Sequence, residues 1–128
     1  MITTKLHITT LTRRTVTRAR GRMAYDELRS RLQGNESLEI DLAGEYPLSL
    51  SFLDELIRHL SDAGCLDRIT FVVKGGDTLR KLGRVSHIRR VAIWYRDTDI
   101  LQRKKVEPLP ETMTESVFVD KKPEDETR

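Results

Sequence analysis

Few residues of this chain belong to the types that build disulfide frameworks, metal clusters or aromatic surfaces. Cys65 is the one cysteine among 128 residues, which excludes an internal disulfide and a cysteine-rich zinc site. Aromatic residues make up 5% of the sequence, so we expect an aliphatic core. No apolar run approaches the about 20 residues of a membrane-spanning helix, and the first residues lack the apolar segment of a secretory signal. We therefore expect a protein of the reducing cytoplasm.

Charged residues, in contrast, are abundant at 34% and are distributed in blocks. The net charge is +4 over residues 1–40, −4 over 41–73, +7 over 74–106 and −4 over 107–128, which gives the overall +3. Two basic stretches thus flank an acidic centre, and an acidic segment follows. That last segment could compete with an acidic partner for the basic surface.

The hydrophobic pattern predicts strands and helices in alternation. We expect strands at 2–8, 37–42, 69–73 and 91–95, and helices at 18–33, 52–63 and 77–88. Such an order predicts an α/β fold, with right-handed connections and one mixed sheet of about four or five strands packed with helices. Residues 1–100 would form this single domain. Residues 101–128, rich in charge and proline, would be a disordered, flexible tail.

Two segments of this pattern carry the clearest local signals. Residues 69–73 are almost continuously apolar, which is typical of a strand buried on both faces. Ser51 and Asp54 form a helix-capping pattern, so we expect Ser51 to be the N-cap. Apolar residues follow at helical spacing, and Gly64 ends the helix.

Three stretches of the chain, together covering roughly residues 1–97, follow one another as the parts of a known domain do. Residues 17–22 open the first helix. Residues 38–42 form a strand, followed by a short loop and the helix start at 49–56. Residues 69–95 supply a strand, a helix and a last strand. This arrangement resembles the STAS domains, which are named for sulfate transporters and anti-sigma-factor antagonists, and specifically the stand-alone bacterial STAS-like domains.

In anti-sigma-factor antagonists, the loop after that strand and the next helix start form the functional surface. An Asp-Ser-Ser-Gly pattern lies there, and its first serine is phosphorylated by a partner kinase with the ATP-binding fold of histidine kinases. Alignment on the following leucine puts Ser49 at the aspartate and Leu50 at the phosphoacceptor. Ser51 then takes the second serine, and Phe52 replaces the glycine. Because Leu50 cannot accept phosphate, the resemblance leaves Ser49 and Ser51 as candidate phosphoacceptors or polar partner contacts.

The resemblance implies a regulatory, non-enzymatic protein–protein interaction module whose partner is an ATPase or kinase of that class. We expect the binding surface to extend from Glu45 to Glu55. Leu50 would be an exposed or edge anchor, and Asp54 and Glu55 would contact a basic partner. The simpler interpretation of Ser51 is that it only caps its helix, which contributes about 1 kcal/mol.

A nucleic-acid-binding accessory protein is the alternative hypothesis, because two clusters of basic residues could contact a phosphate backbone if they share one face. Arg13 and Arg14 begin the first of these clusters, just before the first expected helix. The candidate residues are Arg18, Arg20, Arg22, Arg80, Lys81, Arg84, Arg89 and Arg90. No aromatic residues interleave with them, as a base-stacking surface would require.

Other chemistry-bearing residues lack a supporting pattern. His7, His59 and His87 lie on three separate elements without metal-ligand spacing. Cys65 is expected to be a buried structural thiol. The turn at 74–77 has neither the Walker nor the dinucleotide spacing of glycines. We therefore predict that the chain is not an enzyme and uses no cofactor or metal.

Overall fold

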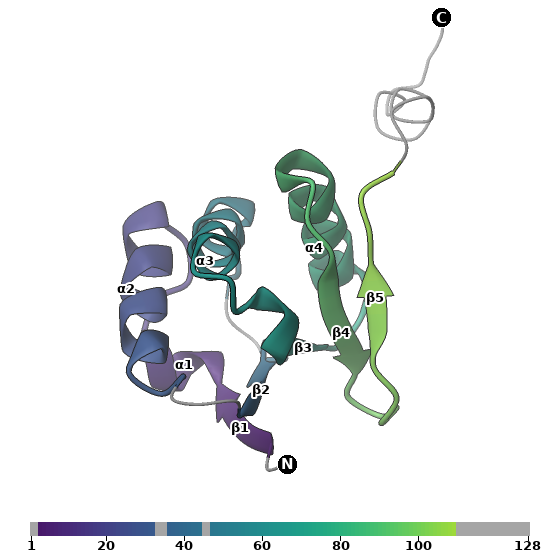
Figure 1. Cartoon of the computed structure of the whole chain (residues 1–128), viewed down its shortest axis with the longest axis horizontal. Coiled ribbons are helices and arrows are strands. Elements are labelled where there is room, and N and C mark those ends of the chain that lie inside the picture. The colour runs from purple at the N-terminus through teal and green to yellow at the C-terminus, as the bar shows by residue number, and fades with distance from the viewer. Residues whose placement is uncertain (1–2, 33–35, 45–46, 110–128) are drawn as a thin grey trace, which may run out of the picture.

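Strands and helices alternate along the chain in the computed structural model, which describes residues 3–32, 36–44 and 47–109 (Figure 1). In chain order, the elements are β1 (Thr3–His7), α1 (Ile8–Leu11), α2 (Arg18–Arg29), β2 (Ser37–Asp41), α3 (Leu50–Asp62), the 3-10 helix η1 (Leu66–Arg68), β3 (Ile69–Val73), α4 (Gly76–Arg89), β4 (Ile93–Asp97) and β5 (Lys104–Val106). None of the helices in these ranges has the length and apolar character that crossing a bilayer needs.

The five strands form one sheet in the order β1-β2-β3-β4-β5. The first four are parallel, and β5 is antiparallel to β4. Each parallel strand neighbours the previous one, and such connections are right-handed. The helices α2, α3 and α4 therefore lie side by side on one face of the sheet (Figure 1). The predicted α/β fold with a mixed sheet is confirmed.

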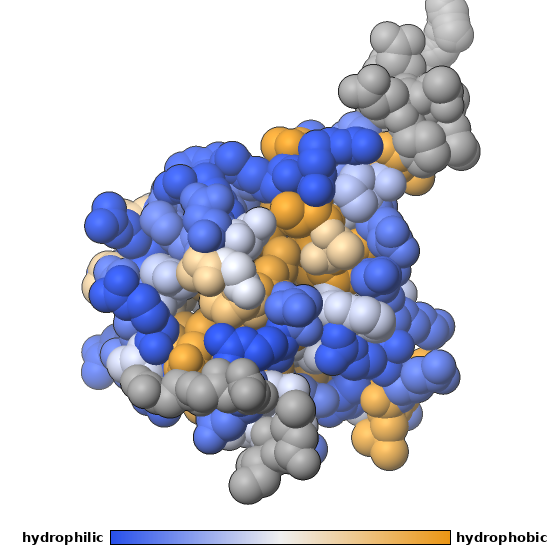
Figure 2. All heavy atoms as spheres, in the orientation of Figure 1, coloured by the Kyte–Doolittle hydropathy of each residue, from blue (hydrophilic) through white to orange (hydrophobic). Residues whose placement is uncertain are grey.

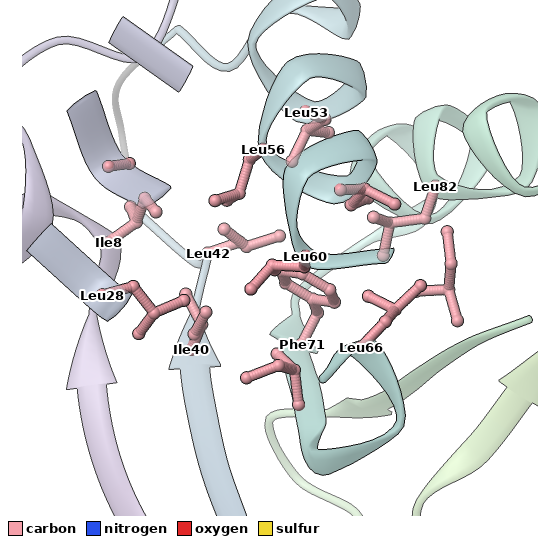
Figure 3. Packing of buried hydrophobic residues seen from close by; sticks show 14 of the residues in the cluster. Ile8, Leu28, Ile40, Leu42, Leu53, Leu56, Leu60, Leu66, Phe71 and Leu82 are labelled. Carbon is pink, nitrogen blue, oxygen red and sulfur yellow. The ribbon is translucent and has the colours of Figure 1, made fainter. Parts of the chain in front are cut away.

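The core lies between this helical layer and the sheet, and it is aliphatic, as the composition predicts. Leucine and isoleucine side chains from α2, β2, α3 and α4 converge there around the ring of Phe71 (Figure 3). Phe52 and Phe71 are the aromatic residues of this core that are fully buried. Figure 2 shows that the exterior is mainly hydrophilic on the face seen there, with apolar side chains gathered near its middle.

Strand β3 is buried on both faces, as predicted, although helices cover only one of them. Long polar side chains cover the other face. Arg96 on β4 reaches across β3 to Glu39 on β2, with Nε–Oε2 and Nη2–Oε1 distances of 2.9 and 3.0 Å. This hydrogen bonding lowers the pKa of Glu39. Beside the pair, the guanidinium of Arg103 lies 3.7 Å from the ring centre of Trp94, so charged and aromatic side chains replace a second helical layer.

The predicted elements differ from the observed ones mainly at their ends. Ile8 begins α1 and does not continue the first strand, and the strand expected at 91–95 is β4, Ile93–Asp97. The helix expected to reach residue 33 ends at Arg29. The expected end of that helix at Gly34 and Asn35 falls outside the described residues.

The sheet also extends past residue 100, where we expected the domain to end. Strand β5, Lys104–Val106, belongs to the segment predicted to be tail and pairs with β4 from Ile93 to Tyr95. The composition of β5 explains why the sequence pattern did not predict it. With two lysines and one apolar residue, it shows no alternation that a sequence pattern could detect.

Helices α2 and α3 approach each other closely at Gly21. A Cβ atom at this position would lie 2.7 Å from the carbonyl oxygen of Phe52 and 3.0 Å from the Cβ of Glu55. Contacts this short require the α3 backbone to move, because the nearest atom is a main-chain oxygen. Gly21 thus sets the distance between the starts of the two helices.

We predict that Gly21→Ala lowers the free energy of unfolding by about 1–3 kcal/mol, because the added methyl group overpacks the α2–α3 contact. Gly83→Ala in α4 is the matched control, since a Cβ there meets nothing within 4 Å. The control should gain about 0.5–1 kcal/mol from the better helix former. Urea unfolding measures both variants, and equal effects at the two glycines would contradict the close-approach explanation.

Candidate functional site

The loops that follow β1, β2 and β3 lie at the same edge of the sheet, because these strands are parallel. Helices α2, α3 and α4 begin at this edge. In open α/β sheets, ligands and partners bind at the carboxyl ends of the strands. The surface expected from the sequence, at the start of α3, also lies at this edge.

Two of these loops are joined into one surface by hydrogen bonds between residues far apart in the sequence. The Thr15 hydroxyl donates to the carbonyl of Pro47, and the Ser49 hydroxyl donates to the carbonyl of Val16. The backbone N–H of Ser49 also donates to the carbonyl of Thr15 at 3.1 Å. The segment 12–17 is thereby fixed against the residues that lead into α3.

An open pocket of about 590 Å³ lies beside this junction, within the size range of ligand pockets. Its lining combines basic, hydroxyl and apolar side chains, contributed by Arg13, Arg14, Thr15, Val16, Thr17, Arg20 and Pro47. The guanidinium groups of Arg13, Arg14 and Arg20 have no ion-pair or hydrogen-bond partner among the described residues. We call these lining residues the arginine pocket.

The acidic residues expected to bind a partner are instead used inside the fold. The Asp54 carboxylate is 7% exposed and accepts hydrogen bonds from Arg89 Nε and Nη2 and from Arg18 Nη1, each at 2.7 Å. The hydrogen bonds from Arg89 and then Arg18 hold its pKa below the usual value. The expected role of Asp54 as a contact for a basic partner is therefore corrected: it connects α3 to α2 and α4.

Glu55 is likewise engaged within the domain. Its carboxylate lies 2.8 Å from Arg58 Nη2 and 2.9 Å from His59 Nε2, and Oε1 lies 3.4 Å from Arg18 Nη1. The hydrogen bond from Arg58 is the main cause of its lowered pKa. The His59 ring stacks on Tyr25 at 5.2 Å, so this histidine has a packing role in the helical layer.

The serines of the expected surface differ in environment. Ser49, half-buried, is the N-cap of α3, and its hydroxyl oxygen accepts from the N–H of Phe52 at 3.0 Å. The prediction that Ser51 is the N-cap is therefore wrong, and Ser51 is an exposed residue in the first turn. Leu50 is partly exposed and packs against the edge of the core, which leaves the edge-anchor alternative open. Glu45 falls outside the described residues.

The candidate nucleic-acid residues do not form one free basic face. Arg18 and Arg89 share Asp54, as described above. Arg80 and Lys81 pair with Asp77 within α4, and Lys81 also donates to the Leu48 carbonyl at 2.7 Å. Arg90 donates to the carbonyl of Leu109. Three members of the set are left without such partners among the described residues: Arg20, Arg22 and Arg84.

Comparison of the chain with protein-family models, curated proteins and solved structures gives no match. The site therefore has to be interpreted from its own chemistry. Within the described ranges, no three His, Cys, Asp or Glu side chains are grouped as metal ligands would be. Cys65 is buried, and desolvation raises the pKa of its thiol, which disfavours the reactive thiolate.

Sequence reasoning counts Arg13 and Arg14 only as part of the basic stretch before the first helix and does not predict that they line a pocket. Both precede α2 and its N-cap Thr17, in a segment without hydrophobic periodicity. They become part of a pocket through the contact between Thr15 and Pro47, which are 32 residues apart in the sequence. The sequence shows this dibasic pair directly before a predicted helix start, but it does not show which distant residues lie beside the pair.

We predict that Asp54→Asn lowers the free energy of unfolding at neutral pH by about 2 kcal/mol, since charge-assisted hydrogen bonds from two arginines are weakened. The folded-state pKa of Asp54 is depressed, so its contribution is complete above the unfolded pKa, near pH 4. It is lost as the pH falls through the folded value. The variant should therefore lose less stability on acidification than the wild type. Asp62→Asn, at a 69% exposed carboxylate on the same helix, should change little.

The cap assignment makes a separate prediction. Ser49→Ala should cost about 1 kcal/mol of unfolding free energy, because it removes both the cap and the bond to the segment 12–17. Ser51→Ala should stay within about 0.5 kcal/mol of the wild type, as expected for an exposed residue. Thermal or urea unfolding of the two variants is the measurement, and the reverse order would restore Ser51 as the cap.

Proposed function

We propose that this chain is a non-enzymatic regulatory module that binds an acidic segment of a protein partner at the arginine pocket. The observation that carries the proposal is the pocket itself, in which Arg13, Arg14 and Arg20 have no partner among the described residues. Guanidinium groups bind carboxylates through paired, charge-assisted hydrogen bonds. Basic side chains that the fold itself does not use are available for such binding.

The apolar part of the pocket favours a protein segment, rather than a small anion, as its ligand. Val16 is 45% exposed although it is apolar, and Pro47 lines the same pocket. Protein interfaces commonly combine an apolar centre with a polar rim, and arginine is enriched among their strongest contacts. An acidic segment with one apolar side chain would satisfy both parts of this lining.

The resemblance to anti-sigma-factor antagonists supports a partner that is an ATPase or kinase with the histidine-kinase ATP-binding fold. Our proposal keeps this partner class and changes the expected charge of its contact. Since Asp54 and Glu55 are paired inside the domain, the surface offered at this edge is basic, and the partner would supply acidic residues. Of the two candidate phosphoacceptors, Ser51 is the accessible one, and a phosphate there would add negative charge to this basic edge.

We predict that Arg14→Glu weakens partner binding about tenfold, as expected for a charge lost from an interface pair. Arg84→Glu is the control, because it makes the same charge change at an exposed α4 residue outside the pocket. The partner is first identified by affinity capture with nuclease treatment, and the purified pair is then titrated calorimetrically.

Two results would contradict the proposal. Equal binding of the partner by Arg14→Glu and Arg84→Glu would remove the pocket from the interface. Capture of nucleic acid in place of protein, with steep loss of binding as salt rises, would favour the alternative function instead. Nucleic-acid binding should then be reduced by Arg22→Glu and Arg84→Glu as well, since phosphate contacts spread over the basic surface.

A further inference from the structure

We infer that residues 110–120 of the same chain occupy the arginine pocket when no partner is bound. This inference rests on the proposed function, because both assign an acidic segment to the same pocket. These residues lie outside the described part of the structure, and they follow directly after Leu109, the last residue described.

The chemistry of the segment matches the lining of the pocket. Residues 110–120 contain three acids, Glu111, Glu115 and Asp120, and no basic residue. The apolar run 117–119, Val-Phe-Val, is placed between the last two of these acids. Three guanidinium groups beside the exposed side chain of Val16 are complementary to this order of charged and apolar groups.

The length of chain after Leu109 fits the distance that it must cover. Leu109 is held by Arg90, directly after the last residue of α4, whereas the pocket lies at the edge where the helices begin. The 14 residues of α4 measure about 21 Å, and α4 lies two helix spacings of about 8–10 Å from α2. The path is therefore about 30 Å, which about nine extended residues cover. Residues 117–119 are therefore far enough along the chain from Leu109 to reach the pocket.

The covalent connection makes even a weak contact effective. A short tether gives a local concentration in the millimolar range, so the segment competes with a partner without needing high affinity of its own. A partner must then displace the segment. The apparent affinity for the partner is reduced because the partner can bind only those molecules in which the pocket is empty. The contact is thus autoinhibitory.

The test uses the full chain and measures the pocket residues by NMR and the segment by proteolysis. Phe118→Ser should shift the amide NMR signals of Val16, Thr17 and Arg20, whereas Leu101→Ser, at an 87% exposed apolar residue, should not. Arg14→Glu should raise the rate of chymotrypsin cleavage after Phe118 about fivefold, the effect of losing one exposed ion pair. Arg84→Glu should leave that rate unchanged.

Unchanged signals in Phe118→Ser, or equal cleavage in the two arginine variants, would overturn the inference. Signals that change with protein concentration would also overturn it, because the segment would then bind a second copy. The partner titration separates this result from the proposed function. If Arg14→Glu loses the partner while Phe118→Ser binds it as the wild type does, the pocket binds the partner but not the segment. If the inference holds, Phe118→Ser should bind the partner more tightly.

Discussion

The paired contact of Asp54 with Arg18 and Arg89 joins the three helices on which the rest of the domain depends. A carboxylate buried among apolar side chains is costly unless donors surround it. Here one donor comes from the first residue of α2 and the others from the end of α4. Since α2 also approaches α3 closely at Gly21, its start has little freedom to move, and the segment 12–17 that precedes it is held against the loop before α3.

This use of charge inside the fold determines the sign of the surface outside it. In the sequence, residues 41–73 form the acidic block, with a net charge of −4. Two of its acids are neutralised by arginines within the domain. Asp54 pairs with Arg18 of α2, and Glu55 pairs with Arg58, one turn later in α3. The same edge of the sheet presents Arg13 and Arg14, which have no partners among the described residues, so a region that looks acidic along the chain is flanked by a basic pocket in space.

Sequence reasoning succeeded where the signal was local. The strand at 69–73 has the predicted bounds, and the alternation of strands and helices is correct, because both follow from hydrophobic spacing. The N-cap of α3 was missed by two residues, since Ser49 and Ser51 are equally good caps by composition. The contact of Ser49 with Val16, 33 residues away, favours Ser49. The arginine pocket was missed because it is defined by a contact between residues 32 apart, whereas strand β5 was missed because its composition shows no alternation.

The side chains that cover the helix-free face of the sheet explain why the candidate site lies at an edge of the sheet. A sheet with helices on only one face usually leaves the other face open to a partner, yet here Arg96 and Glu39 extend across β3 and Arg103 covers Trp94. Opening that face would break a bidentate ion pair and expose Val72, which is buried beneath it. The arginines of the pocket require no such rearrangement, because no bond within the described structure has to be broken before they bind. Binding is therefore expected at the pocket, whose arginines have no partners in the described part of the chain.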